Sequence, residues 1–197
     1  MQKQITDHRS QILLGFLFLL AFLERTVFDL GPNVEIVTTA MILTSFYFGK
    51  KEAFWLTFAV MAVTDRILGN SLIFLFTWSG FLIPALFVNP VLKKLITDHR
   101  SPITKKILAT LPLTATGFGA NIFFFLWTNL GVWLIGNMYP KTAAGLLMSY
   151  INALPFFKNQ LTSSLVFIPL GYLAIEYAFK LSEKFASRSF QPQKSLV

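Results

Sequence analysis

The two histidines are the side chains best suited to acid–base or metal chemistry, and both lie in copies of one hexapeptide. Ile-Thr-Asp-His-Arg-Ser occurs at residues 5–10 and 96–101, and these copies contain His8 and His99. Neither histidine has a second metal ligand at helical spacing, and both fall in segments that we predict to be solvated loops. The sequences after the two copies do not match beyond the hexapeptide. We therefore interpret it as a polar segment that flanks and caps membrane helices, and not as a catalytic, metal-binding or duplicated unit.

Other patterns of enzyme chemistry are missing from the sequence. The chain has no cysteine, which excludes disulfides, thiolate metal sites and a cysteine nucleophile. It contains no G-x-S-x-G, H-E-x-x-H or phosphate-loop motif. We predict a protein that is not an enzyme and that uses no cofactor or metal.

Acidic and amide side chains concentrate in segments that we place at the outer ends of membrane helices. Such residues are costly at membrane depth, so they line a cavity, pair with one another or lie near the interface. Arg25 and Asp29 are spaced for a helical salt bridge, with ligand contact as the alternative. For Asp65, structural pairing or helix-end capping and a role in a site are equally supported. The residues of this outer group are Glu24, Arg25, Asp29, Asn33, Glu35, Asp65, Arg66, Asn70, Asn121, Asn129, Asn137, Asn152 and Asn159.

Composition predicts the elements that position these residues. The chain of 197 residues is 54% hydrophobic, only 13% charged, and includes 22 phenylalanines, which is more apolar surface than one small soluble core buries. We predict an all-α integral membrane protein, formed as one transmembrane domain over residues 1–197. Breaks at Gly, Pro and polar residues separate six apolar segments, each near the length of roughly 20 residues that a span needs. The predicted spans are about 11–28, 34–48, 53–68, 71–88, 107–127 and 161–179.

The segment between the fifth and sixth spans has an ambiguous pattern. Residues 129–159 are about as apolar as the spans but contain Gly136, Pro140, Gly145 and Pro155. We predict an extra interfacial or re-entrant segment here, with tilted extensions of the neighbouring helices as the alternative.

Basic residues predict the orientation of the chain. With the N-terminus inside, all but four of the 17 Lys and Arg residues fall on the cytoplasmic side, as the positive-inside rule expects. The four exceptions are Arg25, Arg66, Lys141 and Lys158. The net charge of +8 therefore reflects topology and not nucleic-acid binding. We predict a multi-pass protein of the cytoplasmic (inner) membrane, with both termini in the cytoplasm.

Two long stretches carry a resemblance to known proteins. The run GPNVEIVTTAMILTSFYFGKKEAFWLTFAVMAVTDRILGN and the run FFFLWTNLGVWLIGNMYPKTAAGLLMSYINALPFFKNQL resemble a family of uncharacterised bacterial membrane proteins. That family is similar to the S (substrate-binding) components of energy-coupling factor (ECF) transporters. The resemblance implies an outward-facing cavity roofed by the loops after spans one, three and five. The implied substrate-binding residues are Asn33, Glu35, Asp65, Asn70, Trp127, Asn129 and Trp133.

The resemblance implies uptake of a small vitamin-like or heterocyclic micronutrient. The expected partners are the lipid bilayer and, as the resemblance implies, an ECF-type energising module. S components dock that module through small residues on the first span, but here the nearest such pair is Ala115 and Gly119 in the fifth. The alternative function is a non-transporting membrane scaffold of a cell-envelope complex. The scaffold predicts that the outer polar residues pair with one another or with a partner and leave no cavity.

Overall fold

A computed structural model describes residues 7–28, 30–69, 71–96 and 102–189. These residues form helices and connecting turns, with no strand among them, so the predicted all-α fold is confirmed for this part of the chain. The elements are α1 (Asp7–Leu23), a short π-helix η1 (Glu24–Phe28), α2 (Val37–Tyr47), α3 (Lys50–Leu68), α4 (Phe74–Ile96), α5 (Pro102–Ile135) and α6 (Ala143–Ser189).

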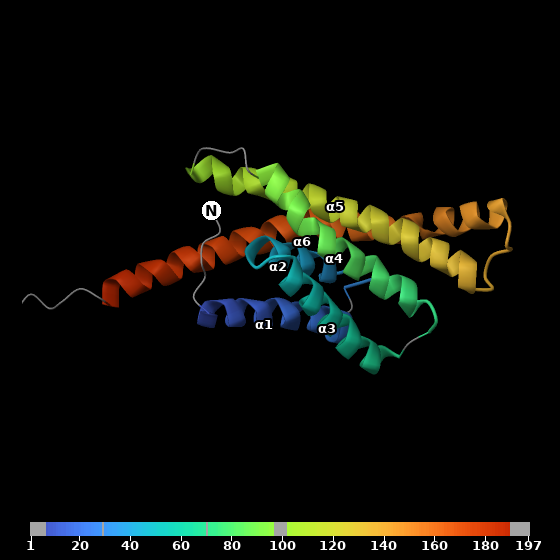
Figure 1. The fold of residues 1–197 in the computed structure, drawn as a ribbon, viewed down its shortest axis with the longest axis horizontal. Helices are drawn as coiled ribbons and strands as arrows, with labels where there is room; N and C mark the ends of the chain where they lie inside the picture. The colour runs from blue at the N-terminus through green and yellow to red at the C-terminus, as the bar shows by residue number, and fades with distance from the viewer. Residues whose placement is uncertain (1–6, 29, 70, 97–101, 190–197) are drawn as a thin grey trace, which may run out of the picture.

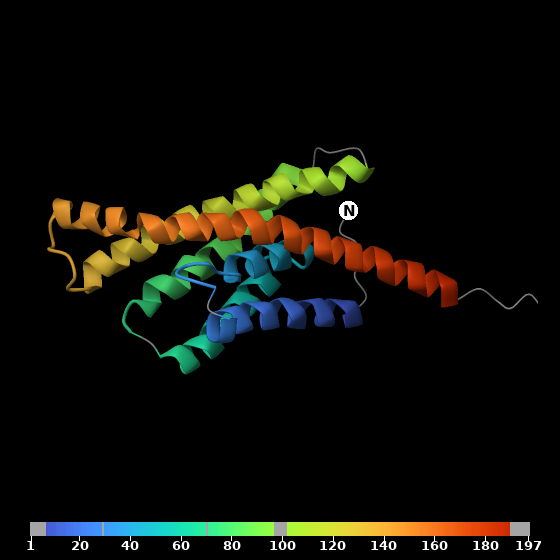
Figure 2. The same ribbon diagram turned by 180° about the vertical axis from the view of Figure 1, so that it is seen from behind.

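The helices run back and forth along the long axis of the molecule (Figures 1 and 2). The α1–α2, α3–α4 and α5–α6 connections lie at one end, and α6 finishes at the opposite end, near the start of α1. The turn between α5 and α6 extends beyond the α3–α4 turn, because these two helices have 34 and 47 residues. At 1.5 Å per residue, both are longer than the roughly 30 Å core of a bilayer.

Helix α2 forms the centre of the bundle. It contacts α1, α3, α4, α5 and α6. Nine of its 11 residues are buried, so it is enclosed by other elements around its whole circumference. The turn before it contains Gly31 and Asn33 at positive φ, and Gly49, also at positive φ, follows it. These positions let the chain enter and leave the centre of the bundle within a few residues.

Each predicted span corresponds to one helical region of the structure. Four of these regions are long and apolar enough to cross a membrane, which indicates a helical membrane protein: His8–Phe28, Phe74–Leu95, Ala109–Ile135 and Ala143–Phe185. Helix α2 is apolar but short, and α3 begins with Lys50, Lys51 and Glu52. The predicted spans at 34–48 and 53–68 therefore form helices at the predicted positions in the chain. These two helices lack the length or the apolar composition of the other four.

The extra interfacial or re-entrant segment predicted between the last two spans is wrong. Helix α5 continues to Ile135 and α6 starts at Ala143, so residues 129–159 are mostly the ends of these two helices. Pro155 lies inside α6. A proline removes one backbone hydrogen bond, and the packing of α6 along α5 supports the helix across that gap.

The first hexapeptide copy also differs from its prediction. His8 is exposed and lies in the first turn of α1, and not in a loop. His99 belongs to residues 97–101, which are outside the described part of the chain. In the described part, no group of three or more potential metal ligands of the His, Cys, Asp or Glu type occurs.

Close packing between α4 and α5 depends on Gly131. A Cβ atom at this position would lie 2.2 Å from Cγ of Phe76, whereas one at Gly119, on the same helix, would have no atom within 4 Å. We expect Gly131→Ala to lower the free energy of unfolding by about 1–3 kcal/mol, because the added methyl group overpacks the interface. Thermal unfolding of the purified protein in detergent measures this effect.

Gly119→Ala is the matched control. It adds the same methyl group to an open face of α5 and improves helix propensity by roughly 1 kcal/mol. An equal loss of stability in both variants would contradict the assignment of Gly131 to the interface.

Candidate functional site

Six of the seven predicted substrate-binding residues lie in the described part of the chain, and none of them lines either of the two cavities described below. Asn33 is exposed in the turn before α2. Glu35 follows this turn, still before α2, and is buried. Asp65 is near the end of α3, whereas Trp127, Asn129 and Trp133 lie along the second half of α5. The side chains of the other five residues form hydrogen bonds with groups of the protein. Asn70 lies outside the described residues.

Asp65 is held by an ion pair with Arg25 and by one further hydrogen bond, from Trp78. Its Oδ1 lies 3.0 Å from Nη2 of Arg25, and its Oδ2 accepts a hydrogen bond of 2.6 Å from the indole N–H of Trp78. Arg25 also donates from Nε to the hydroxyl of Thr64 at 3.0 Å. The side chains of Arg25 and Asp65 are 19% and 10% exposed. The pair therefore ties η1 to α3, and Trp78 adds α4.

Arg25 has partners that local spacing did not predict. Its guanidinium group reaches Thr64 and Asp65 on another helix, whereas the predicted partner, Asp29, lies outside the described residues. The π-helical turn at Glu24–Phe28 widens the last turn of the first helical region and changes the direction of its side chains. For Asp65, the structure shows pairing, which was one of the two roles left open by the sequence.

Two buried carboxylates accept hydrogen bonds at the N-terminus of α2. Glu24 Oε2 accepts the N–H of Ile36 at 3.1 Å, and Glu35 Oε2 accepts the N–H of Thr38 at 3.1 Å. Ile36 is the N-cap residue and has no side-chain acceptor. The carboxylates therefore replace the usual Ser, Thr, Asp or Asn cap and also complement the helix dipole.

A buried polar network continues from this cap into α5 and α6. The Thr38 hydroxyl lies 2.5 Å from Glu35 Oε1 and 3.0 Å from Asn121 Oδ1. The Asn121 amide donates to the Gln160 carbonyl at 3.1 Å and to the Ser164 hydroxyl at 2.7 Å. Asn121 is fully buried, with 0% of its surface exposed. Glu35 thus belongs to a buried network that joins helices.

The three predicted substrate-binding residues on α5 donate their side-chain hydrogen bonds to other groups of the protein. Trp127 donates to Ser79 Oγ at 2.7 Å, Asn129 to the Phe125 carbonyl at 2.7 Å, and Trp133 to the Pro140 carbonyl at 3.0 Å. Trp127 also stacks on Phe123, at 6.1 Å between ring centroids and 14° between planes. These side chains attach α5 to α4 and to the turn before α6.

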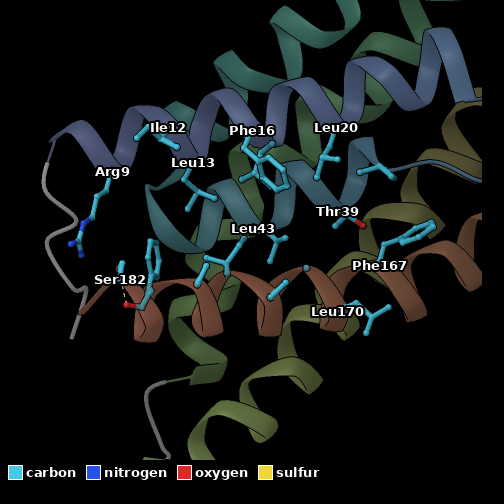
Figure 3. Close-up of a pocket in the computed structure, with 17 residues that line it drawn as sticks. Arg9, Ile12, Leu13, Phe16, Leu20, Thr39, Leu43, Phe167, Leu170 and Ser182 are labelled. Carbon is cyan, nitrogen blue, oxygen red and sulfur yellow. Dashed lines mark hydrogen bonds between the residues drawn. The ribbon is translucent and has the colours of Figure 1, made fainter. Parts of the chain in front are cut away.

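The larger cavity lies elsewhere, between α1 and α6, with α2 as its floor (Figure 3). It has a volume of about 700 Å³. In the described residues, α1 and α6 each pack on α2, and their backbones do not approach each other closely. Gly171, Ala174 and Ala178 face the groove from α6, and their small side chains leave room beside the larger residues of α1. We call this cavity the α1–α6 groove.

The α1–α6 groove is almost entirely apolar. Its walls include Phe16 and Leu20 of α1, and its floor includes Leu43 of α2. Arg9 and Ser182 lie at one end of it (Figure 3). None of the predicted site residues lines it. The small residues at 171, 174 and 178 on α6 were the available sequence signal, but their partner helix is six elements earlier in the chain.

A second cavity of about 550 Å³ lies between α1 and α3, and its lining includes Gly15 of α1 and Lys51, Glu52 and Trp55 of α3. It is smaller, and its charges are at the first turn of α3.

The apolar helices indicate an all-helical membrane protein, and an apolar groove lies between two of them. Comparison with known families gives its membership. A family model described as a family of unknown function, DUF6580, matches residues 5–187, and the chain belongs to that family. Comparison with curated proteins and with solved structures gives no significant match.

The Arg25–Asp65 pair predicts a measurable coupling. Arg25→Gln and Asp65→Asn should each lower the free energy of unfolding by about 1–3 kcal/mol, because each leaves a partly buried charge without its partner. The double variant should lose less than the sum, with a coupling energy of roughly 0.5–3 kcal/mol. Chemical or thermal unfolding of the four proteins gives the cycle.

Arg66→Gln provides the control, since Arg66 is exposed and adjacent to Asp65. Strictly additive losses in the double variant, or an Asp65→Asn protein as stable as Arg66→Gln, would show that the pair does not hold the helices together.

Proposed function

We propose that this protein is a membrane-embedded binding protein that takes up a small micronutrient, in the manner of an ECF S component, and that it is not an enzyme. The observation that supports this proposal is the α1–α6 groove. Its volume of about 700 Å³ falls within the range of roughly 300–1,000 Å³ typical of small-molecule sites, which are concave and mainly apolar.

The location of the groove changes the predicted route of binding. The outward-facing cavity expected from the resemblance would use Asn33, Asp65 and Trp127, but Asp65 and Trp127 bond to other helices in this conformation. The groove instead lies between α1 and α6, and its walls are almost entirely apolar. A ligand that enters here would be largely apolar and would partition into the bilayer first.

The proposal includes six membrane crossings in the cytoplasmic membrane, with both termini in the cytoplasm. The alternation of helix ends in Figure 1 and the basic residues near one of these ends support it. An energising module remains a proposed partner. Ala115 and Gly119 are exposed on α5, and a Cβ atom at Gly119 would meet nothing within 4 Å, so this face can accept a closely packed helix.

The topology can be tested directly because the chain has no cysteine of its own. Single cysteines at Lys51, Lys94 and Lys184 should resist an impermeant thiol reagent in intact cells, and a cysteine at Asn137 should react. The basic positions lie on the side that the positive-inside rule assigns to the cytoplasm. Labelling of the Lys94 site from outside would contradict the proposed topology with six membrane crossings.

The groove itself can be tested by filling it. Ala174 lines the groove and is exposed, so Ala174→Phe should occupy the cavity without overpacking a core. We expect the wild-type protein, purified in detergent, to retain a small molecule detectable by native mass spectrometry, and the variant to lose it. A ten-fold loss of affinity corresponds to about 1.4 kcal/mol.

Leu173→Phe is the matched control, because Leu173 is 40% exposed on the same helix and does not line the groove. It should retain the molecule as the wild type does. Equal retention by the wild type and by Ala174→Phe would contradict the groove as the binding site.

One observation favours the scaffold as a second candidate function. The outer polar residues satisfy one another, as the Arg25–Asp65–Trp78 contacts show, and this is the arrangement that a non-transporting scaffold predicts. The scaffold, however, offers no role for the groove. A wild-type protein that binds no small molecule in the retention experiment would favour the scaffold.

A further inference from the structure

We propose that the α1–α6 groove binds a single-chain amphiphile with one anionic group, and that Arg9 binds the anion. The proposal rests on the function proposed above and names the chemical class of the ligand. Its basis is the juxtaposition in Figure 3, where a long apolar channel ends at one guanidinium group.

Arg9, the cation at the end of the groove, is able to bind an anionic group. Arg9 is exposed, and it forms no ion pair with any residue in the described part of the chain. Its planar group presents five N–H donors, which match the two oxygens of a carboxylate or phosphate. The neighbouring Ser182 donates its hydroxyl proton to the Phe179 carbonyl at 2.8 Å, so Arg9 is the principal donor at this end.

The dimensions of the groove fit one extended apolar chain. On α1 its lining runs from Arg9 to Leu20, which at 1.5 Å per residue is about 16 Å. This is about half of the roughly 30 Å hydrocarbon core, the depth of one leaflet. Apart from Arg9, Thr39 and Ser182, the lining side chains are apolar or glycine. A chain that enters at Arg9 therefore meets apolar walls up to the outer turn of α1.

The same features disfavour other ligands. A neutral heterocycle would leave the guanidinium group without a partner, and a polar nucleotide would need donors along walls that have none. A volume of about 700 Å³ suits one chain more closely than a phospholipid with two. A free long-chain carboxylate satisfies both the cation and the apolar channel.

The test compares two probes that differ only in charge. Palmitate and hexadecanol have chains of equal length, and their binding to the full-length protein in neutral detergent can be measured by native mass spectrometry. We expect palmitate to bind more tightly than hexadecanol. Arg9→Gln should weaken palmitate about ten-fold and leave hexadecanol unchanged, because a charged hydrogen bond contributes only to the anion. Lys50→Gln is the matched control: it removes an exposed charge from the first turn of α3, outside the groove, and should change neither probe.

Each outcome separates this inference from the function on which it rests. If both probes bind equally and Arg9→Gln changes neither, while Ala174→Phe abolishes both, the groove is a binding site but the anionic ligand is wrong. If Ala174→Phe leaves both probes bound, the groove assignment fails as well. If palmitate does not bind, but protein in phosphatidylglycerol nanodiscs retains that lipid through Arg9, the occupant is a membrane lipid and the proposed ligand is overturned.

Discussion

The structure depends on how the buried N-terminus of α2 is satisfied. A helix start leaves N–H groups without partners, and these are costly where no water reaches them. Here the chain on both sides provides a carboxylate, because Glu24 precedes the turn and Glu35 follows it. The first contact holds the end of the first helical region against α2, and the second leads through Thr38 to Asn121 on α5. A single local requirement thereby fixes the relative positions of three helical regions around the central helix.

That requirement also explains the polar character of the outer half of the molecule. Charged and amide groups at membrane depth need partners, and these side chains find them within the protein. Arg25 meets Asp65 and Thr64, and Asn159 donates to the Pro32 carbonyl at 2.9 Å beside the turn into α2. Because these donors and acceptors are already used, the space that remains for a ligand is apolar.

The sequence predicted the helices well and their partners poorly. Hydropathy and breaks located all six helical regions, since apolar runs and Gly or Pro signals are local properties. The same signals failed at 129–159, where Gly145 and Pro155 were read as interruptions but lie within the long helix α6. Local spacing also did not predict Asp65 as a partner of Arg25, because the two residues are 40 positions apart. The groove was not predicted from the sequence, because its walls, α1 and α6, are distant in the chain and are brought together by their shared packing on α2.

Ile36 connects the cap to the groove. Its N–H is bound by Glu24, and its side chain lines the groove at the end opposite Arg9. The cap therefore positions a residue of the groove lining. In the described residues the backbones of α1 and α6 do not approach each other closely, and α1 packs on α2 and α3. The Glu24 and Arg25 contacts attach η1, which follows α1, to the start of α2 and to α3. The polar cap and the apolar groove therefore meet at Ile36, because one atom of this residue is bound by the cap and the residue also lines the groove.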